Sequence, residues 1–515
     1  MTKRPILLIT LLLALATAKP ASAASTTVLV QSNLSSGSMS FLCLLEGCQV
    51  TETLSGSPSN FYVLSVSGSV NTQFLSSVLQ STAGILNVAV LGATNNPLGN
   101  RYIVRTTGGL LNLQALCAAN FCQVVRPLDG GLNQLFLIAG PSNQDPLLLL
   151  EVLQALPGVL DAELDQVITL ATGGAQATTP PPSLVNTTPV QYYGSVVWQG
   201  YVDQPATQII GTNRTQQSFN VTGFGIIADI DTGVDPNHPV LKPVLLPGYD
   251  FTRNQVGGSE MNDLPSGTPA NETPCVNCTP GQVNQHSIAM VDQHSIAMVD
   301  SPQYADFGHG TMVAGLLHLV APTASIMPLK AFHADGTGNL SDIIRATYYA
   351  AENHANVVNM SFDFTTSSQA MATAVSWAES QGTLFVASAG NDGQMEMVYP
   401  AGYTNVMGVA STNDQDQRSS FSNYGDQIVW VAAPGEAVVT TYPFGGYAAG
   451  WGTSFSAPMV SACVDLFENA RSNLAQTQAK LYVGHARLLL AVGMGSGRLD
   501  IPWAVGASQS KVGDF

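Results

Sequence analysis

The sequence predicts an α/β protein in which a parallel sheet flanked by helices follows two small α+β units. Beyond residue 308, segments typical of strands and helices alternate, which is the pattern of a parallel sheet covered on both faces. Before residue 171 the chain repeats without gaps, so that Cys43 and Cys48 recur as Cys117 and Cys122. The expected divisions are a signal peptide in 1–24, repeats in 25–98 and 99–172, a linker in 173–190, and a large domain in 191–515 with an insert at about 242–306.

The composition limits the classes of partner. At 515 residues the chain can hold about three domains, and its 45% hydrophobic residues can fill large cores. Only 10% of residues are charged, and the formal net charge is −17. Nucleic acid binding requires clustered Lys and Arg, so this balance argues against nucleic acid. An acidic surface suits a soluble protein outside the cell.

The first residues have the three parts of a secretory signal peptide. Lys3 and Arg4 precede the apolar run Ile6–Ala16, and the small residues Ala21–Ala23 follow it. The run is too short for a good membrane span, although an uncleaved anchor is the minor alternative. We therefore expect a secreted protein that is not held in a membrane once the signal is removed.

Each repeat predicts the order strand, helix, strand, strand, helix, strand, which is that of a ferredoxin-like unit. The alternative is a pair of small binding or spacer domains. In the second copy the expected elements are Tyr102–Arg105, Leu110–Cys122, Gln123–Pro127, Leu135–Ala139, Pro146–Leu156 and Val159–Ile168.

The seven cysteines fit a secreted protein. The two cysteines of each repeat are five residues apart, which predicts one local disulfide per repeat in an oxidising compartment. Cys275 and Cys278 form a lone C-x-x-C in a polar loop, where a disulfide is favoured because zinc would need two more ligands. Cys463 lies on the apolar face of a predicted helix and is interpreted as core filling.

The insert contains a perfect octad repeat, in which Gln285–Asp292 recurs as Gln293–Asp300. Its two histidines, His286 and His294, raise the hypothesis of a metal site. An eight-residue period places equivalent side chains near one helix face, and a local duplication explains the identity without any function. We therefore assign no metal ligands here.

The large domain carries the alternating segments. Ligands of such a sheet bind at the carboxyl ends of its strands, where Asp231 and Asn391 fall. The expected strands are 224–231, Ser325–Ala331, Val357–Phe362 and Leu384–Ala389, and the expected helices are Ser341–Asn353 and Ala370–Ala378.

Ser454 is the candidate nucleophile, because a glycine-led turn presents its hydroxyl at the start of a helix. Gly452 lets a substrate backbone approach closely, and Pro458 is tolerated in a first helical turn. An ordinary helix cap is the alternative. The apolar stripe that anchors this helix is Val460, Cys463, Val464 and Phe467.

A serine hydroxyl needs a base to take its proton and a carboxylate to orient that base. Asp231 ends a strand and is followed by Thr232 and Gly233, while His309 opens a helix in Gly-His-Gly-Thr. Asn391 ends another strand in Ala-Gly-Asn, where its amide can donate a hydrogen bond to an oxyanion.

These four motifs, in the chain order Asp, His, Ser, resemble those of the subtilisin-like serine peptidases. The resemblance runs from about Tyr192 to the end of the chain. It implies a secreted serine endopeptidase in which Asp231 orients His309, His309 takes the proton of Ser454, and Asn391 stabilises the oxyanion of an acyl-transfer reaction.

A weaker resemblance links the second repeat to the propeptides of the same family, through Pro157–Val159 and Ala162–Asp165. It implies a self-inhibited precursor in which the chain's own propeptide covers the cleft and assists folding. By the same resemblance, the residues that would line the substrate site are Ser361, Phe362, Ala389, Gly390 and Val398.

The chain departs from the family pattern at several positions. Asp229 stands where an apolar strand residue is usual, on the same face as Asp231. Phe362 and Asp363 replace the usual Leu-Gly, and Val398 replaces a pocket-floor glycine, which raises the hypothesis of a narrowed pocket. The loop that often binds calcium after the histidine helix is missing, so structural calcium is compatible with the chain but unassigned.

Two function classes follow. The first is a secreted endopeptidase that acts on proteins or peptides, needs no cofactor for catalysis and is expected to be a monomer. The second is a catalytically inactive extracellular binding protein on the same scaffold. The joint presence of Asp231, His309, Asn391 and Ser454 favours the first.

Overall fold

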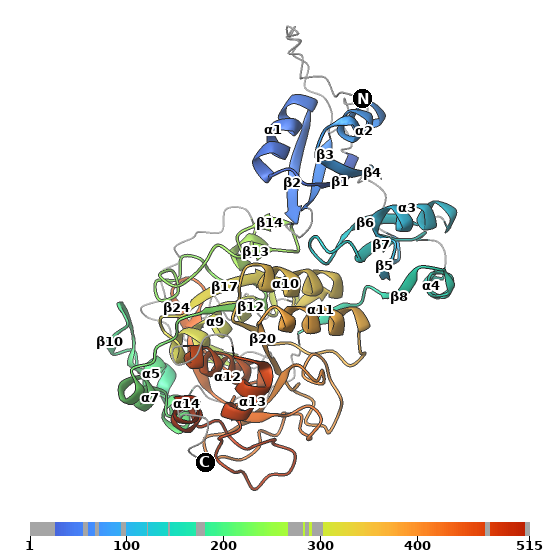
Figure 1. Ribbon diagram of the computed structural model, residues 1–515. Coiled ribbons are helices and arrows are strands. Elements are labelled where there is room, and N and C mark those ends of the chain that lie inside the picture. Colours follow the sequence, from blue (N-terminus) through green and yellow to red (C-terminus); the bar gives the residue numbers. More distant parts are fainter. Residues whose placement is uncertain are drawn as a thin grey trace.

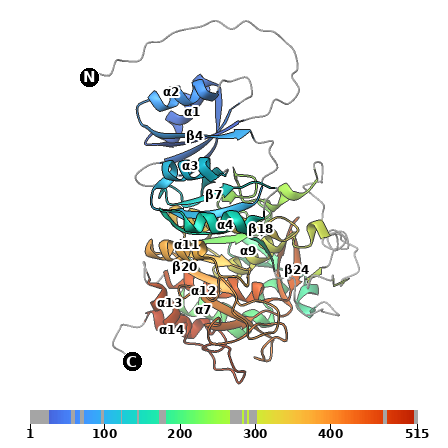
Figure 2. The same ribbon diagram turned by 90° about the vertical axis from the view of Figure 1, so that its right-hand side faces the viewer.

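The computed structural model describes residues 26–509 except 55–59, 67–71, 94–98, 121, 143–144, 171–180, 266–281, 284–287, 291–301 and 469–473. Two small units lie above a larger domain, and the second unit lies between the first unit and that domain (Figures 1 and 2). No helix among the described residues is long and apolar enough to cross a bilayer.

The two small units share one topology. Each is a four-stranded antiparallel sheet with two helices, in the sheet orders β2-β3-β1-β4 and β6-β7-β5-β8. The cysteines of each unit form the predicted local disulfides, Cys43 with Cys48 and Cys117 with Cys122. The elements of the first unit are β1 (Thr26–Ser32), α1 (Ser36–Glu46), β2 (Cys48–Leu54), β3 (Asn60–Val66), α2 (Thr72–Ser81) and β4 (Ile85–Ala93); those of the second are β5 (Arg101–Thr106), α3 (Gly109–Asn120), β6 (Gln123–Pro127), β7 (Leu135–Ala139), α4 (Pro146–Ala155) and β8 (Val159–Leu164).

The large domain is built on an eight-stranded sheet in the order β14-β13-β17-β12-β19-β20-β21-β22. All neighbouring strands are parallel except β13 and β14, which confirms the predicted parallel sheet. The strands are β12 (Ile226–Asp231), β13 (Tyr249–Asp250), β14 (Gln255–Val256), β17 (Ser325–Lys330), β19 (Val357–Met360), β20 (Leu384–Ser388), β21 (Met407–Thr412) and β22 (Val431–Pro434).

Helices cover both faces of this sheet (Figure 1). α9 (His309–Val320) and α12 (Thr453–Glu468) pack on one face, and α10 (Leu340–Glu352) and α11 (Gln369–Ser380) pack on the other. Strand residues alternate between the two cores, so Ile227 joins the first and Ala228 the second. Cys463 is buried in the first core, as predicted.

Smaller elements complete the domain. They are β10 (Pro189–Tyr192), β11 (Ser195–Trp198), α5 (Gln199–Val202), α6 (Pro205–Ile210), α7 (Thr212–Phe219), β15 (Gln282–Val283), β16 (Ile288–Met290), β18 (Thr337–Asn339), β23 (Val438–Tyr442), β24 (Gly446–Gly450), α13 (Gln476–Val483) and α14 (Ile501–Gln509).

The second unit docks on the helices α10 and α11 through two carboxylates. Asp165 accepts hydrogen bonds from the backbone N–H and hydroxyl of Ser341, at 2.8 and 2.9 Å, in the first turn of α10. Glu163 accepts from the hydroxyl of Ser368 and the N–H of Gln369, at the start of α11. Negative charge is favourable at both helix N-termini, so these contacts hold the second unit in a fixed position on α10 and α11.

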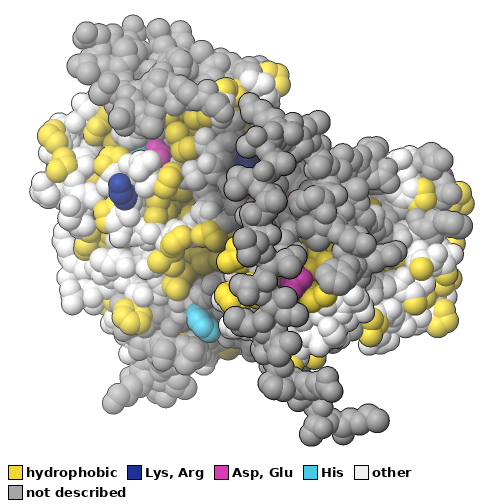
Figure 3. Space-filling model, turned by 90° about the horizontal axis from the view of Figure 1, so that it is seen from above, with side chains coloured by type: hydrophobic (Ala, Val, Ile, Leu, Met, Phe, Trp, Pro, Cys, Tyr) yellow, Lys and Arg dark blue, Asp and Glu magenta, His cyan; other side chains and the backbone are white. Residues whose placement is uncertain are grey.

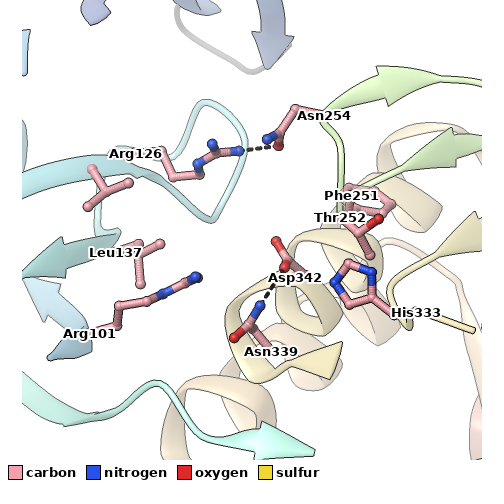
Figure 4. Close-up of a pocket in the computed structure, with 10 residues that line it drawn as sticks. Arg101, Arg126, Leu137, Phe251, Thr252, Asn254, His333, Asn339 and Asp342 are labelled. Atoms are coloured by element: carbon pink, nitrogen blue, oxygen red, sulfur yellow. Dashed lines mark hydrogen bonds between the residues drawn. The ribbon is translucent and has the colours of Figure 1, made fainter. Parts of the chain in front are cut away.

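A cavity of about 190 Å³ lies beside these contacts, between the second unit and the large domain (Figure 4). Arg101 and Arg126 face it from the second unit, and His333 and Asp342 face it from the other side. Arg101 also pairs with Asp165 at 2.7 Å, so one arginine supports the carboxylate that caps α10.

One local prediction was wrong. The segment Val159–Ile168 is not one strand, because the chain leaves the unit after β8 and forms β9 (Val167–Thr169). β9 pairs antiparallel with β18 of the large domain. The chain therefore adds a strand to the large domain at the point where β8 was expected to continue. Within the octad repeat, for which no element was predicted, residues 288–290 form the strand β16, which pairs with β24.

Several predictions fall on residues that the structure does not describe. These are the signal peptide in 1–24, most of the octad repeat with His286 and His294, the pair Cys275 and Cys278, and the linker up to residue 180.

Because two histidines are buried, we expect the free energy of unfolding to decrease in acid. Burial lowers the pKa of His238 and of His318 to about 4, against about 6.5 in an unfolded chain. Their contribution is therefore fully present above pH 6.5 and is lost as the pH falls from 6.5 towards 4, because only the unfolded chain then binds the protons. The loss is on the order of 3 kcal/mol per histidine.

We expect His318→Gln, in a Ser454→Ala background that prevents self-digestion, to lose less unfolding free energy than its parent between pH 7 and pH 4.5. Denaturant unfolding at the two pH values measures this difference. His354→Asn is the control, since His354 is exposed. An equal loss in the His318→Gln variant and its parent would contradict the assignment.

Candidate active site

Asp231 and His309 form the centre of the site. Asp231 is the last residue of β12, and His309 is the first residue of α9. The Nδ1 atom of His309 lies 2.8 and 2.9 Å from the two carboxylate oxygens of Asp231. Such a pair fixes the imidazole tautomer, with the proton on Nδ1 and Nε2 left as the base.

The approach of β12 to α9 depends on a glycine. A Cβ atom on Gly310 would lie 2.1 Å from the carbonyl oxygen of Gly233. The N–H of Gly310 also donates to the hydroxyl of Thr232 at 3.0 Å. The Asp-Thr-Gly and His-Gly-Thr segments therefore contact each other directly, and a side chain at Gly310 would separate them.

Ser454 lies in the first turn of α12, and its side chain is buried with only 5% of its surface exposed. Its hydroxyl donates to the carbonyl oxygen of Ser361 at 3.1 Å. Among the described contacts no hydrogen bond joins Ser454 to His309, so the hydroxyl must rotate before the imidazole can take its proton. Long or misaligned catalytic hydrogen bonds are common in unliganded enzymes.

Asn391 lies three residues beyond β20 and contacts the turn before Ser454. Its side-chain oxygen accepts from the N–H of Thr453 at 2.8 Å and from the Thr453 hydroxyl at 3.0 Å. Its Nδ2 atom is 3.5 Å from the point where a Cβ on Gly452 would stand. The amide nitrogen therefore lies beside Gly452, two residues before Ser454.

The charges around His309 favour its protonated form. Burial alone would lower its pKa, but the charge and hydrogen bond of Asp231 outweigh this and, with Asp306, raise the pKa of His309 to about 9. Asp306 lies in the segment before α9, and burial raises its own pKa to about 6. The imidazole can act as a base only when neutral, so this site favours alkaline conditions.

Glu260 is a buried carboxylate that the sequence reading missed. It accepts from the N–H of Gly308 at 2.7 Å and also from the hydroxyls of Thr311 and Thr232. Burial raises its pKa to about 8. Glu260 therefore connects the two segments that carry Asp231 and His309. It lies in the insert, whose loops gave no periodic signal.

Asp229 is buried on the expected face of β12. Its Oδ1 accepts from the amide of Asn359 at 3.0 Å, while its Oδ2 is buried without a hydrogen-bond partner among the described residues. Burial, followed by the charge of Asp231, raises the pKa of Asp229 well above its usual range. The charge of Asp229 is in turn one of the smaller causes that raise the pKa of His309.

Asn359 extends this contact to the nucleophile helix. It also donates to the hydroxyl of Ser361 at 3.0 Å and accepts from the hydroxyl of Ser461 at 2.8 Å. The hydroxyl of Ser361 then donates to the carbonyl oxygen of Ser454 at 2.9 Å. An asparagine inside the apolar strand Val357–Met360 was the available signal for this network.

The residues expected at the substrate site occupy two adjacent strand ends. Ser361 contacts Ser454, and Ala389 and Gly390 directly precede Asn391. The side chain of Phe362, however, is fully buried and packs 5.1 Å from Phe332, ring centre to ring centre. Val398 is also fully buried in that core. Both side chains therefore fill the interior beneath the site.

Together these groups provide a nucleophile, a base held by a carboxylate, and an amide donor at one end of a parallel sheet. That set of groups can perform acyl transfer without a metal ion. Among the described residues, no group of three or more His, Cys, Asp or Glu side chains is arranged to hold a metal.

Comparison with known proteins identifies relatives of the large domain. Residues 225–495 match the model of the subtilase family. The chain is 31% identical over 255 residues to thermitase of Thermoactinomyces vulgaris, a match covering 50% of this chain and 78% of thermitase. It is 33% identical over 254 residues to a thermophilic serine proteinase of Bacillus sp. (strain AK1), covering 49% of this chain and 54% of the relative. It is 36% identical over 182 residues to subtilisin BL of Lederbergia lenta, covering 34% and 67%.

Proposed function

Because the chain belongs to the subtilase family and is a serine-type endopeptidase, we propose that it is secreted and self-inhibited and that it cleaves through Ser454, His309 and Asp231. The observation that carries the residue assignment is the hydrogen-bonded pair of His309 and Asp231 beside the first turn of the helix that presents Ser454. Its substrates are proteins or peptides.

In the proposed reaction Ser454 Oγ attacks the scissile carbonyl while His309 Nε2 takes the hydroxyl proton. The Oγ–C bond forms, and the carbonyl oxygen becomes an oxyanion that the Asn391 amide and the Ser454 N–H stabilise. His309 then gives the proton to the leaving amine, which leaves an acyl-enzyme. Water hydrolyses this intermediate with His309 again as the base.

We further propose that the second unit is the inhibitory propeptide. Support comes from Glu163 and Asp165, which contact the starts of α11 and α10, and from β9, which adds a strand to the large domain. The chain after β9 leads into residues 171–180, where self-cleavage would separate the two parts. Burial raises the pKa of Glu163 and of Asp165, so the docking of the second unit should weaken as the pH rises and these carboxylates ionise.

Other parts of the proposal rest on the sequence. We propose export from the cell because the N-terminal charges and the apolar run that follows them have the form of a secretory signal peptide. The described surface seen in Figure 3 carries few charged side chains. We propose that catalysis requires no cofactor, that any structural calcium site remains to be assigned, and that the mature enzyme is a monomer.

The test is the intact mass and N-terminal sequence of purified residues 24–515 over time, beside the Ser454→Ala variant. We expect the wild-type chain to shorten within 171–189 while the variant stays intact, because only the wild type has the nucleophile. A serine-reactive phosphonate should also attach to Ser454 of the wild type alone. Processing of both proteins at the same rate, or labelling elsewhere, would contradict the proposal.

A further inference from the structure

A carboxylate stands between the two strand ends of the substrate site. Asp363 follows β19, two residues after Ser361, and Gly390 follows β20 and precedes Asn391. The Oδ2 atom of Asp363 lies 3.3 Å from the point where a Cβ on Gly390 would stand. The side chain of Asp363 therefore crosses from one strand end to the other, beside the residues that contact Ser454.

Among the described residues, this carboxylate has no partner of opposite charge. Its Oδ1 atom is buried and has no hydrogen-bond partner among the described residues. No ion pair in the described part of the chain joins Asp363 to a Lys, Arg or His side chain. A buried carboxylate oxygen without a donor is costly in a folded protein, so a donor from outside these contacts, such as a water, an ion or a ligand, would stabilise it.

Two further carboxylates add negative charge at the same place. Burial first, and then the charges of Asp392 and Glu396, raise the pKa of Asp363 to about 7. Asp392 follows Asn391, and both Asp392 and Glu396 are exposed. Asn423 donates to Asp392 at 3.3 Å and so holds it near Gly390, whose own Cβ position is 2.4 Å from the Asn423 amide nitrogen. Three acidic side chains, for which the described part of the chain shows no ion pair with a basic side chain, therefore lie near the ends of β19 and β20.

The position also fixes which part of a substrate can reach Asp363. The carbonyl of Ser361 contacts the Ser454 hydroxyl, and Asn391 contacts the turn before Ser454. A peptide whose carbonyl lies between Ser454 and Asn391 must therefore place the side chain of that same residue between the strand ends 361–363 and 389–391. This residue, on the acyl side of the scissile bond, is here called the acyl residue.

We infer that Asp363 receives the positively charged side chain of a lysine or arginine acyl residue, so that the substrates are proteins cleaved after basic residues. The inference rests on the proposed function, since it requires Ser454 to be the nucleophile. The ammonium or guanidinium supplies the donor that Asp363 Oδ1 lacks, and Asp392 and Glu396 attract the cation from solvent.

The experiment compares peptide pairs that differ only in arginine against citrulline at the acyl residue, because citrulline keeps the shape and removes the charge. The self-processed wild-type enzyme is assayed at pH 8.5, where Asp363 is ionised. Rates are divided by the number of active sites counted with the serine-reactive phosphonate, so a misfolded fraction does not count. We expect kcat/KM for arginine to exceed that for citrulline by about 10- to 100-fold.

Asp363→Asn keeps the shape of the side chain and should bring the arginine-to-citrulline ratio close to one. Asp426→Asn is the matched control, because Asp426 is an exposed carboxylate in a neighbouring loop, and it should keep the wild-type ratio. A wild-type ratio near one, or an unchanged ratio in Asp363→Asn, overturns the inference and leaves the peptidase assignment intact. Absence of both phosphonate labelling and Ser454-dependent cleavage overturns the proposed function and the inference with it.

Discussion

Replacing His309 with alanine is expected to lower kcat by about 10⁶-fold, as the same change does in subtilisin. The reason is the geometry around Asp231, whose two oxygens lie 2.8 and 2.9 Å from Nδ1 and leave Nε2 as the only ring atom available as a base. Single-turnover rates per active site on one peptide substrate measure the loss. KM should change little, because His309 contacts the reacting atoms and not the rest of the substrate.

The double variant His309→Ala, Ser454→Ala tests whether the two residues act together in one catalytic step or contribute independently. If they act as a unit, the double variant is no slower than His309→Ala alone, since either change stops the same proton transfer. His354→Asn serves as the control for loss of a histidine and should retain full activity. Additive losses, or a His309→Ala enzyme within tenfold of wild type, would refute the assignment of His309 as the base.

Asp231→Asn is expected to lower kcat by about 10⁴-fold, because an amide can hold the wrong imidazole tautomer. It should also change the pH profile. Asp231 is the main group that raises the pKa of His309 to about 9 against the opposing effect of burial. Without that charge the imidazole loses its proton at lower pH. The acidic limb in a plot of the residual kcat/KM against pH should therefore shift to lower pH.

Asp306→Asn separates the two effects of Asp231. Asp306 also raises the pKa of His309, but no hydrogen bond joins their side chains among the described contacts. This variant should therefore shift the acidic limb to lower pH by a smaller amount than Asp231→Asn does, while kcat at high pH stays within about tenfold of wild type. A loss of kcat as large as that of Asp231→Asn would show that charge, and not orientation, is the main contribution of Asp231.

The sequence predicted the parts of the site that obey local rules. Asp231 ends β12, Asn391 follows β20 by three residues, and His309 and Ser454 lie in the first turns of helices, so each has a periodic element on one side to anchor it. Alternation of strands and helices then placed all four at one edge of a parallel sheet. The local disulfides were predictable for the same reason, because five-residue spacing is a short-range property.

Contacts between distant segments could not be predicted in this way. Glu260 lies in loops without periodicity, and its role depends on donors 48 and 51 residues away in sequence. The separation of β8 from β9 depends on the short strand β18 of the large domain, which pairs with β9 in a two-stranded sheet and which no pattern inside the repeat encodes. Phe362 was expected at the substrate, but strand alternation and its large apolar ring place it in the core with Phe332.

The helix-capping carboxylates of the second unit have a consequence for the duplication itself. The first unit has Ala89 and Leu91 at the positions that correspond to Glu163 and Asp165. Gene duplication therefore produced two copies of one fold with only one set of charges that fits α10 and α11. The first unit therefore lacks the two carboxylates with which the second unit contacts the large domain. If the second unit is the inhibitor, as proposed, removal of that unit alone should release the enzyme.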